Sequence, residues 1–171
     1  VQGDPEALLL VEVVGDSDVE VESKLDSLDA KNLGYATTRV SEPKEQASVW
    51  AVRKAGLGLM MNVTGPEKPL AFVEDTAVAP ERLPEYVRRF DEIVKANGTT
   101  AGYYGHASVG CLHIRPLIDL KRVDGVERMA SITSQISDLV LEFGGSMSGE
   151  HGDGLVRSVL NEKMFGPVIY D

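Results

Sequence analysis

The sequence predicts an α+β domain with a ferredoxin-like antiparallel sheet, helices on one face, a helical insertion and a C-terminal helical segment. Two observations lead to this prediction. Apolar runs of strand length alternate with segments in which apolar residues recur every three or four positions, the period of an amphipathic helix. These elements follow the order strand–helix–strand twice, which is typical of a split β-α-β layout. We expect residues 1–171 to form a single domain, as a fragment of a longer protein.

The first half of the chain is expected to hold two strands and two helices. Ser17 and Glu20 form a capping box, which predicts a helix start, and Pro43 is suited to the first turn of the next helix. Apolar runs without a helical period predict the strands. The expected elements are a strand at Ala7–Val14, a helix from Ser17 to Asn32, a strand at Tyr35–Val40 and the inserted helix from Pro43 to about Gly58.

The second half is expected to contain three strands and three helices. Leu83, Val87, Phe90 and Val94 fall on one face of a helix that Pro80 opens. Glycine and asparagine mark the ends of the helices. The expected elements are strands at Leu70–Val78, Thr99–Tyr104 and Leu112–Arg115, and helices at Pro80–Asn97, at Val123–Phe143 and from about Ser158.

Composition and charge exclude several functions. The net charge of -10 leaves no basic stripe to neutralise phosphates, so we expect no nucleic-acid partner. The single cysteine, Cys111, rules out an internal disulfide framework, and no apolar run has the length of a membrane span. The nucleotide-binding fingerprints and the serine-nucleophile elbow are absent. A cytoplasmic enzyme or binding domain is the class that this composition favours.

A glycine-rich stretch, Gly144–Arg157 (GGSMSGEHGDGLVR), contains Glu150 and His151. Glycine at this density lets backbone approach a ligand closely. The only other histidines, His106 and His113, lie together in a second glycine-bearing turn. On a helix their side chains would lie roughly 10 Å apart along the axis, whereas a hairpin can bring both to one point. We therefore expect the three histidines to share one site.

His106, His113 and Glu150 would give a His/His/Glu ligand set, which many open catalytic zinc sites use. Glu150 and His151 are neighbours, and neighbours in extended chain point to opposite sides. This arrangement favours a metal-ligating role for one residue and a substrate-facing base role for the other. The alternative is that each histidine is a polar residue satisfied within its own turn.

Four other residues allow two interpretations each. Arg53 could bind a substrate carboxylate through two hydrogen bonds, or it could be a solvated charge on its helix. Arg115 and Arg157 flank the histidine turns and allow the same two interpretations. Cys111 could be a fourth metal ligand or a small buried side chain.

Four separated segments resemble the C-terminal domain of FAD-linked oxidases. They are Tyr104–His113 (YGHASVGCLH), Gly145–Gly154 (GSMSGEHGDG), Trp50–Arg53 (WAVR) and Phe72–Val78 (FVEDTAV). That family includes D-lactate dehydrogenases, the glycolate oxidase flavin subunit and D-2-hydroxyglutarate dehydrogenase. Among the family, the long bacterial members, which also carry iron–sulfur modules, have the segments most similar in sequence to FVEDTAV and VGCLHIRP.

The resemblance implies roles for particular residues. It implies metal ligands at His106, His113 and Glu150, a catalytic base at His151 and a carboxylate-binding arginine at Arg53. The sequence departs from the family pattern at two positions. Many members have asparagine in place of Cys111. The hydroxyglutarate enzymes have a substrate-contacting asparagine in place of Arg115, and an arginine there would favour a substrate with a second carboxylate.

The resemblance also implies cofactors and partners. FAD would be bound mainly by a separate N-terminal domain, with Gly149, Glu150 and Gly152 of this chain beside it. The metal would be divalent, zinc before manganese or iron. The substrate would be a small D-2-hydroxy acid of the lactate, glycolate or 2-hydroxyglutarate type, oxidised to the 2-oxo acid. An iron–sulfur module or a quinone would accept the electrons, and the parent protein would be cytoplasmic or peripheral at the inner membrane.

Two other functions remain open from the residues alone. The first is a metal-dependent hydrolase, with a metal on His106, His113 and Glu150 and with His151 as the base. The second is a non-catalytic interaction module of ferredoxin-like fold.

Overall fold

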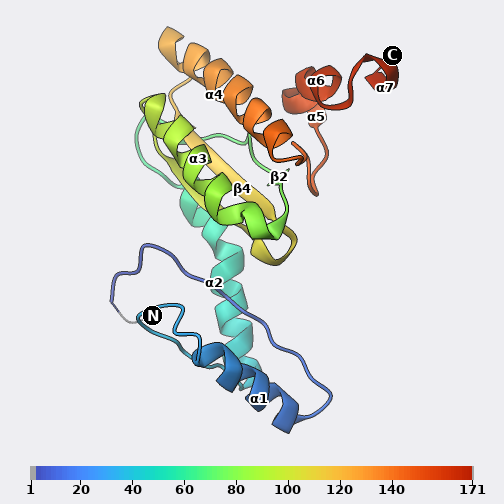
Figure 1. Cartoon of the computed structure of the whole chain (residues 1–171). Coiled ribbons are helices and arrows are strands. Elements are labelled where there is room, and N and C mark those ends of the chain that lie inside the picture. The colour runs from blue at the N-terminus through green and yellow to red at the C-terminus, as the bar shows by residue number, and fades with distance from the viewer. Residues whose placement is uncertain (1–2, 171) are drawn as a thin grey trace. The chain divides into compact units, whose positions relative to one another are not determined.

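The computed structural model describes residues 3–170, which form two compact units that divide between Ala55 and Gly56 (Figure 1). The first unit contains α1 (Asp18–Asp29) and the start of α2 (Pro43–Met61), which continues into the second unit. The Ser17 hydroxyl accepts the Glu20 N–H at 3.3 Å, so the predicted capping box does open α1. The number of domains expected from the sequence stays a prediction.

The strands predicted at Ala7–Val14 and Tyr35–Val40 are wrong. Neither segment has strand structure, and Leu8 and Leu9 are exposed. A strand forms only where a neighbouring chain accepts and donates its backbone hydrogen bonds, and neither of these segments has a strand partner. The second segment instead follows α1, where Arg39 pairs with Asp26 and Asp29.

The second unit contains a small antiparallel sheet around β4 (Cys111–Ile118). The strand β3 (Ala101–His106) pairs with β4 along one edge, and the short strands β1 (Lys68–Pro69) and β2 (Thr76–Ala77) pair with the other edge. The predicted strand Leu70–Val78 is therefore strand only at β2. Its backbone still follows β4, because the Leu70 and Asp75 N–H groups donate to β4 carbonyls at 3.0 and 2.8 Å.

Helices account for most of the remaining chain of this unit. The long helices lie close to their predicted positions, since each carries a clear apolar stripe. In chain order the helical elements are η1 (Pro80–Arg82), α3 (Leu83–Ala96), η2 (Ala107–Val109), α4 (Val123–Glu142), α5 (Gly154–Arg157), η3 (Ser158–Leu160), α6 (Asn161–Phe165) and α7 (Pro167–Tyr170). Within residues 3–170, no helix combines the length and the apolar character that crossing a bilayer requires.

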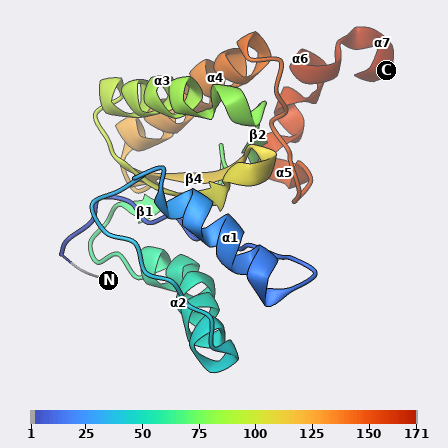
Figure 2. The same cartoon turned by 60° about the horizontal axis from the view of Figure 1, so that its bottom comes forward.

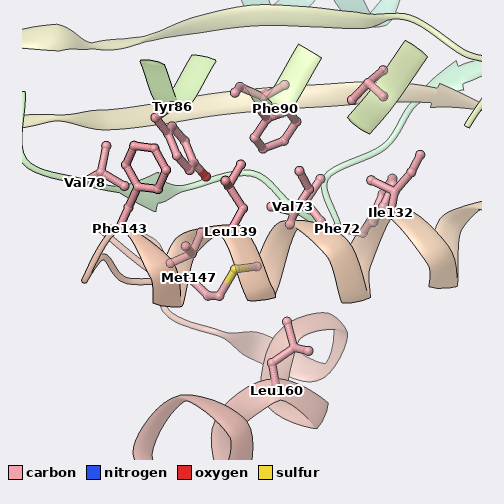
Figure 3. Close-up of a cluster of buried hydrophobic side chains, with 14 of the residues drawn as sticks. Phe72, Val73, Val78, Tyr86, Phe90, Ile132, Leu139, Phe143, Met147 and Leu160 are labelled. Atoms are coloured by element: carbon pink, nitrogen blue, oxygen red, sulfur yellow. The ribbon is translucent and has the colours of Figure 1, made fainter. Parts of the chain in front are cut away.

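The core lies between the sheet and two helices. α3 and α4 lie side by side over one face of the strands (Figure 2). Ile114 and Ile118 of β4 belong to this core. Tyr86 and Phe90 of α3 pack in the same cluster (Figure 3). The Tyr86 hydroxyl is satisfied by the Thr76 hydroxyl at 2.9 Å. The α+β class is confirmed, with one face of the antiparallel sheet covered by helices.

Strand alternation leaves a second set of side chains on the opposite face. Successive residues of a strand point to opposite sides, so Cys111, His113 and Arg115 share the face that α3 and α4 do not cover. His106 and Tyr104 of β3 lie on the same face, because they pair with Cys111 and His113. The fold thus gathers the predicted polar residues on one side of the sheet.

Candidate active site

The hairpin of β3 and β4 brings His106 and His113 together. η2 forms the turn, and Gly110 completes it with a φ of 70°, where a Cβ would collide with the Val78 carbonyl. The two imidazole centroids are 5.5 Å apart. The hairpin expected from the sequence is confirmed.

Glu150 lies between these two histidines. Its Oε2 atom is 3.4 Å from His113 Nε2 and 3.7 Å from His106 Nε2, so this carboxylate is close to both imidazoles. His113 is buried, and its Nδ1 atom has no hydrogen-bond partner within the described part of the chain. Burial, and then the charge of His151, lower the pKa of His113, which favours the neutral imidazole that ligates metals.

Two wider groups of side chains could also hold an ion at this place. The ligand atoms within each group lie within 4.8 Å of one another. One group is Asp75, Cys111, His113 and Glu150, and the other is Glu74, His113 and His151. His113 belongs to both groups, whereas His106 belongs to neither and has its Nε2 atom 3.7 Å from Glu150 Oε2. His113 is therefore the centre of the donor cluster.

Asp75 holds the loop that carries Glu150 and His151. Its carboxylate is fully buried and accepts the backbone N–H groups of Gly149, Glu150 and His151 at 3.0, 3.0 and 2.9 Å. The Ser148 hydroxyl adds a fourth donor at 3.2 Å. Asp75 itself has a φ of 71°, in the left-handed region that residues other than glycine adopt at a cost. The loop is built around this carboxylate.

His151 stacks on His113. Their ring planes are 12° apart and their centroids are separated by 4.8 Å, while 46% of the His151 side chain stays exposed. Its Nδ1 atom is 3.4 Å from Glu74 Oε1. The Oε2 atom of the same carboxylate is 2.7 Å from Arg115 Nη2. The Nδ1 edge of the His151 ring therefore faces the buried Glu74 carboxylate, while the rest of the ring stays accessible to solvent.

Arg157 fixes the loop from the other side. It is buried, and its guanidinium donates to the backbone carbonyls of Glu74, Met147 and Gly152. Five donors in a rigid fork suit a residue that must reach three separate acceptors. The Nη2 atom of Arg157 also lies 3.7 Å from Asp75 Oδ2. The burial of Arg157 contradicts the solvated charge, and its contacts are to backbone carbonyls and to this carboxylate.

The profile of the family described as "FAD linked oxidases, C-terminal domain" matches residues 1–171. The chain belongs to this family. D-2-hydroxyglutarate dehydrogenase of Haemophilus influenzae is 38% identical over 122 residues, which cover 71% of this chain and 12% of the relative. The protein of that name from Pseudomonas putida is 34% identical over 165 residues, 92% of this chain and 16% of the relative. D-lactate dehydrogenase of Archaeoglobus fulgidus is 32% identical over 162 residues, which cover 94% of this chain and 33% of the relative. The chain thus spans about a sixth or less of the two hydroxyglutarate dehydrogenases.

Five of the predicted site residues of this FAD-linked oxidase C-terminal domain lie together in the second unit. His106, His113, Glu150, His151 and Arg115 come together on one face of the sheet. Gly149 and Gly152 lie in the same loop as Glu150. Arg53 lies in the first unit, so its role stays a prediction.

Cys111 is the small buried residue that one interpretation expected. Burial, and then the charge of Asp75, raise the pKa of its thiol to about 12, so the thiol stays protonated. Its Sγ atom donates to Asp75 Oδ1 at 3.6 Å. The thiolate is the form that binds metals, and this raised pKa applies to the site without a metal ion. The protonated state favours packing over ligation, although Cys111 is within reach of the donor cluster.

Sequence reasoning missed Glu74 and Asp75 as members of the site. The signal was present, because two adjacent carboxylates interrupt the apolar segment Phe72–Val78. Carboxylates are almost never fully buried unless they are paired, so two of them in a predicted buried strand should have been given partners. The identity of those partners could not be read from the sequence, because the loop donors lie more than 70 residues away.

Proposed function

We propose that this domain binds the substrate and a divalent metal for a flavin-dependent dehydrogenase that oxidises a D-2-hydroxy acid to the 2-oxo acid. The observation that carries the proposal is that Glu150 Oε2 lies 3.4 Å from His113 Nε2 and 3.7 Å from His106 Nε2, with His151 stacked on His113 and still accessible. Membership of the FAD-linked oxidase family supports the flavin. The names of the relatives support a 2-hydroxy acid.

The donor set fits a divalent cation. His106, His113 and Glu150 would hold it with two imidazole nitrogens and one carboxylate oxygen, a set that zinc accepts with a position left open. Manganese and iron bind the same ligand types. A metal held there would bind the substrate hydroxyl and lower its pKa. The buried Nδ1 atom of His113 has no hydrogen-bond partner among residues 3–170, and the nearby Asp75 Oδ1 lies 4.0 Å away, beyond hydrogen-bond distance.

His151 is the proposed base. Oxidation of a 2-hydroxy acid removes one proton from the hydroxyl and one hydride from C2. The exposed part of the His151 ring can receive the proton at a nitrogen. No side chain of the chain can accept a hydride, so FAD, bound mainly by another domain, supplies that chemistry. Gly149, Glu150 and Gly152 are proposed to border the flavin.

Two arginines are proposed to bind carboxylate. Arg53 would hold the carboxylate next to C2, so that the C2–H bond is directed at the acceptor. Arg115 would meet a second carboxylate in a dicarboxylic substrate, as the names of the hydroxyglutarate relatives suggest.

We further propose that an iron–sulfur module or a quinone receives the electrons from the flavin, in a cytoplasmic or peripheral inner-membrane protein. This part rests on the similarity of the segments Phe72–Val78 and Val109–Pro116 to those of the long bacterial family members.

The complete flavoprotein that carries this domain tests the proposal. Anaerobic mixing with a panel of D- and L-2-hydroxy acids should bleach the flavin with D acids only. His151→Ala should retain FAD and lower the rate of bleaching by about 10²–10⁴-fold, the usual contribution of a general base. Bleaching at the normal rate by His151→Ala would exclude the base role. Metal-dependent hydrolysis of esters or amides without flavin chemistry would support the hydrolase instead.

A further inference from the structure

We propose that Glu74 is a positioning residue for His151, and that Arg115 is the counterion that makes this possible. The inference rests on the proposed function, since it concerns the residue proposed as the base. Glu74 bridges the two, with one carboxylate oxygen 3.4 Å from His151 Nδ1 and the other 2.7 Å from Arg115 Nη2. A carboxylate between a guanidinium and an imidazole has a different partner for each oxygen.

The ion pair between Glu74 and Arg115 is largely shielded from water. Only 10% of the Glu74 side chain and 12% of the Arg115 side chain are exposed. A buried carboxylate needs a partner of opposite charge, and Arg115 provides one from the neighbouring strand. The Oε2 atom of Glu74 and the Nε atom of Arg115 have no hydrogen-bond partner among residues 3–170, so the pair is not locked by hydrogen bonds of its own. Glu74 thus remains able to bond with His151.

The charges around His151 determine which ring nitrogen carries the proton. Its Nδ1 edge faces Glu74 Oε1 at 3.4 Å and Asp75 Oδ1 at 3.9 Å. Both oxygens of Asp75 already accept backbone N–H groups, so Glu74 is the closer and less occupied acceptor. An ionised carboxylate only accepts hydrogen bonds, so in the hydrogen bond proposed between Glu74 and His151, Nδ1 is the donor and Glu74 Oε1 the acceptor. The proton on Nδ1 leaves Nε2 with its lone pair free.

The stack on His113 removes the other freedom of the ring. With planes 12° apart, the His151 ring cannot rotate without leaving this contact. In the proposed reaction the O–H bond of the substrate breaks, its proton bonds to Nε2, and the hydride at C2 passes to the flavin. The positive charge that develops on the imidazole then faces the Glu74 carboxylate. Glu74 touches neither the substrate nor the flavin in this scheme and acts through His151 alone.

Glu74→Gln in the complete flavoprotein tests the inference. Arg115 can only donate hydrogen bonds, so the new amide must turn its oxygen to Arg115 and its NH₂ group to His151. The NH₂ group would force the proton from Nδ1 to Nε2 and block the base. The limiting rate of flavin reduction should fall about 10²–10⁴-fold, with the apparent Kd of the D-2-hydroxy acid changed by less than about threefold. Glu74→Asp keeps the charge and should recover at least part of the rate.

Glu142→Gln is the matched control, because Glu142 also pairs with an arginine, Arg89, but lies on α4 away from the site. It should leave the rate unchanged. A normal rate with Glu74→Gln would overturn the inference, and so would a raised Kd with a normal rate, which would place Glu74 in substrate binding. Loss of the bound metal with this variant would also overturn it, because Glu74 would then be a ligand.

A second measurement, on the unmodified protein, decides the point even where Glu74→Gln fails to fold. The ¹⁵N chemical shifts of the histidine rings, with His151 identified by its loss in His151→Ala, should show the proton on Nδ1. A proton on Nε2 would refute the positioning role. The two proposals fail separately. If His151→Ala reduces flavin normally, the base role is wrong, whereas if only Glu74→Gln behaves normally, the base role stands without Glu74.

Discussion

Asp75 accepts the backbone N–H of His151 at 2.9 Å, although 76 residues separate them in the chain. The same carboxylate accepts the N–H groups of Gly149 and Glu150. Three successive N–H groups that point at one anion form an anion-binding nest, here filled by a side chain of the protein itself. The nest fixes the backbone of both proposed functional residues, Glu150 and His151, at once. Their separate roles therefore depend on one buried carboxylate.

Asp75→Asn should weaken both the loop and the metal site. The amide has one acceptor oxygen in place of two, and its NH₂ group would oppose the backbone N–H donors. We expect a loss of about 1–3 kcal/mol in the free energy of unfolding and a fall in metal affinity of about 10–100-fold. Denaturant unfolding and a metal titration measure the two effects. Asp138→Asn is the control, since its side chain is 67% exposed, and it should change stability by less than about 0.5 kcal/mol.

The contribution of Asp75 to stability should depend on pH. Burial raises the pKa of this carboxyl, but the N–H donors of His151 and Glu150 outweigh burial and hold the pKa below its ordinary value of 3.8. Because the pKa of Asp75 is lower in the folded protein than in the unfolded chain, the carboxylate stabilises the fold fully at pH values above about 3.8. This stabilisation is lost as the pH falls through the pKa that Asp75 has in the folded protein. The difference in unfolding free energy between the unmodified protein and Asp75→Asn, measured with a chelator present, should stay constant above about pH 5 and shrink below about pH 4. A difference that grows on acidification would contradict the assignment.

The parts of the fold that could be predicted are those with a local cause. α3 and α4 lie where their apolar periodicity places them, because an amphipathic helix makes all its backbone hydrogen bonds within itself. The runs Ala7–Val14 and Tyr35–Val40 predict strands only because they lack a helical period. Strand formation depends on a partner elsewhere in the chain, and no local pattern reports whether that partner exists.

The residues of the candidate site also divide into those whose contacts are local in sequence and those whose contacts are not. His106 and His113 could be placed together because one short turn joins their strands. Glu74 and Asp75 could not be joined to His151 and Glu150, because their contacts close loops of more than 70 residues. The sequence showed that two acids lay in an apolar segment, but not which donors satisfied them.

Glu150→Gln should remove the metal. The amide keeps the volume of the side chain but loses the charge that two neutral imidazoles cannot replace. Loss of a residue that only hydrogen-bonds to a metal ligand lowers metal affinity roughly 10–100-fold. Because Glu150 is itself a proposed ligand, we expect a larger fall in metal affinity for Glu150→Gln. Metal analysis after dialysis against a weak chelator provides the measurement. Glu127 lies at an exposed position on α4, so Glu127→Gln should keep one full equivalent of metal per protein. Full retention of metal by Glu150→Gln would shift the site to the group that contains Glu74 and His151.

Gly149→Ala should displace the loop. A Cβ at this position would lie 2.9 Å from Cys111 Sγ and 3.2 Å from the Asp75 carbonyl, and the buried thiol has little room to move. Overpacking of this kind costs about 1–3 kcal/mol. Adding Cys111→Ala removes the sulfur and should restore part of the loss, so a double-mutant cycle of thermal unfolding should show coupling between the two positions. Purely additive effects would mean that the sulfur is not the obstacle.

Gly58→Ala is the control for that experiment. Gly58 lies within α2, and a Cβ there meets nothing within 4 Å. Alanine is about 1 kcal/mol better than glycine in a helix interior, so this substitution should raise the unfolding free energy where Gly149→Ala lowers it. The same chemical change should thus have opposite signs at the two sites.

Arg157→Lys should be poorly tolerated even though the charge is kept. The guanidinium reaches the carbonyls of Glu74, Met147 and Gly152 from a buried position, whereas an ammonium is a single point and cannot span them. At least one buried carbonyl would lose its partner, at a cost of about 2–3 kcal/mol in unfolding free energy. Arg122→Lys, at an exposed position paired with Asp124, should cost less than about 0.5 kcal/mol. Because Arg157 anchors both Glu74 and the loop of Glu150, Arg157→Lys should also slow flavin reduction in the folded fraction, and a normal rate there would show that the loop holds its geometry through Asp75 alone.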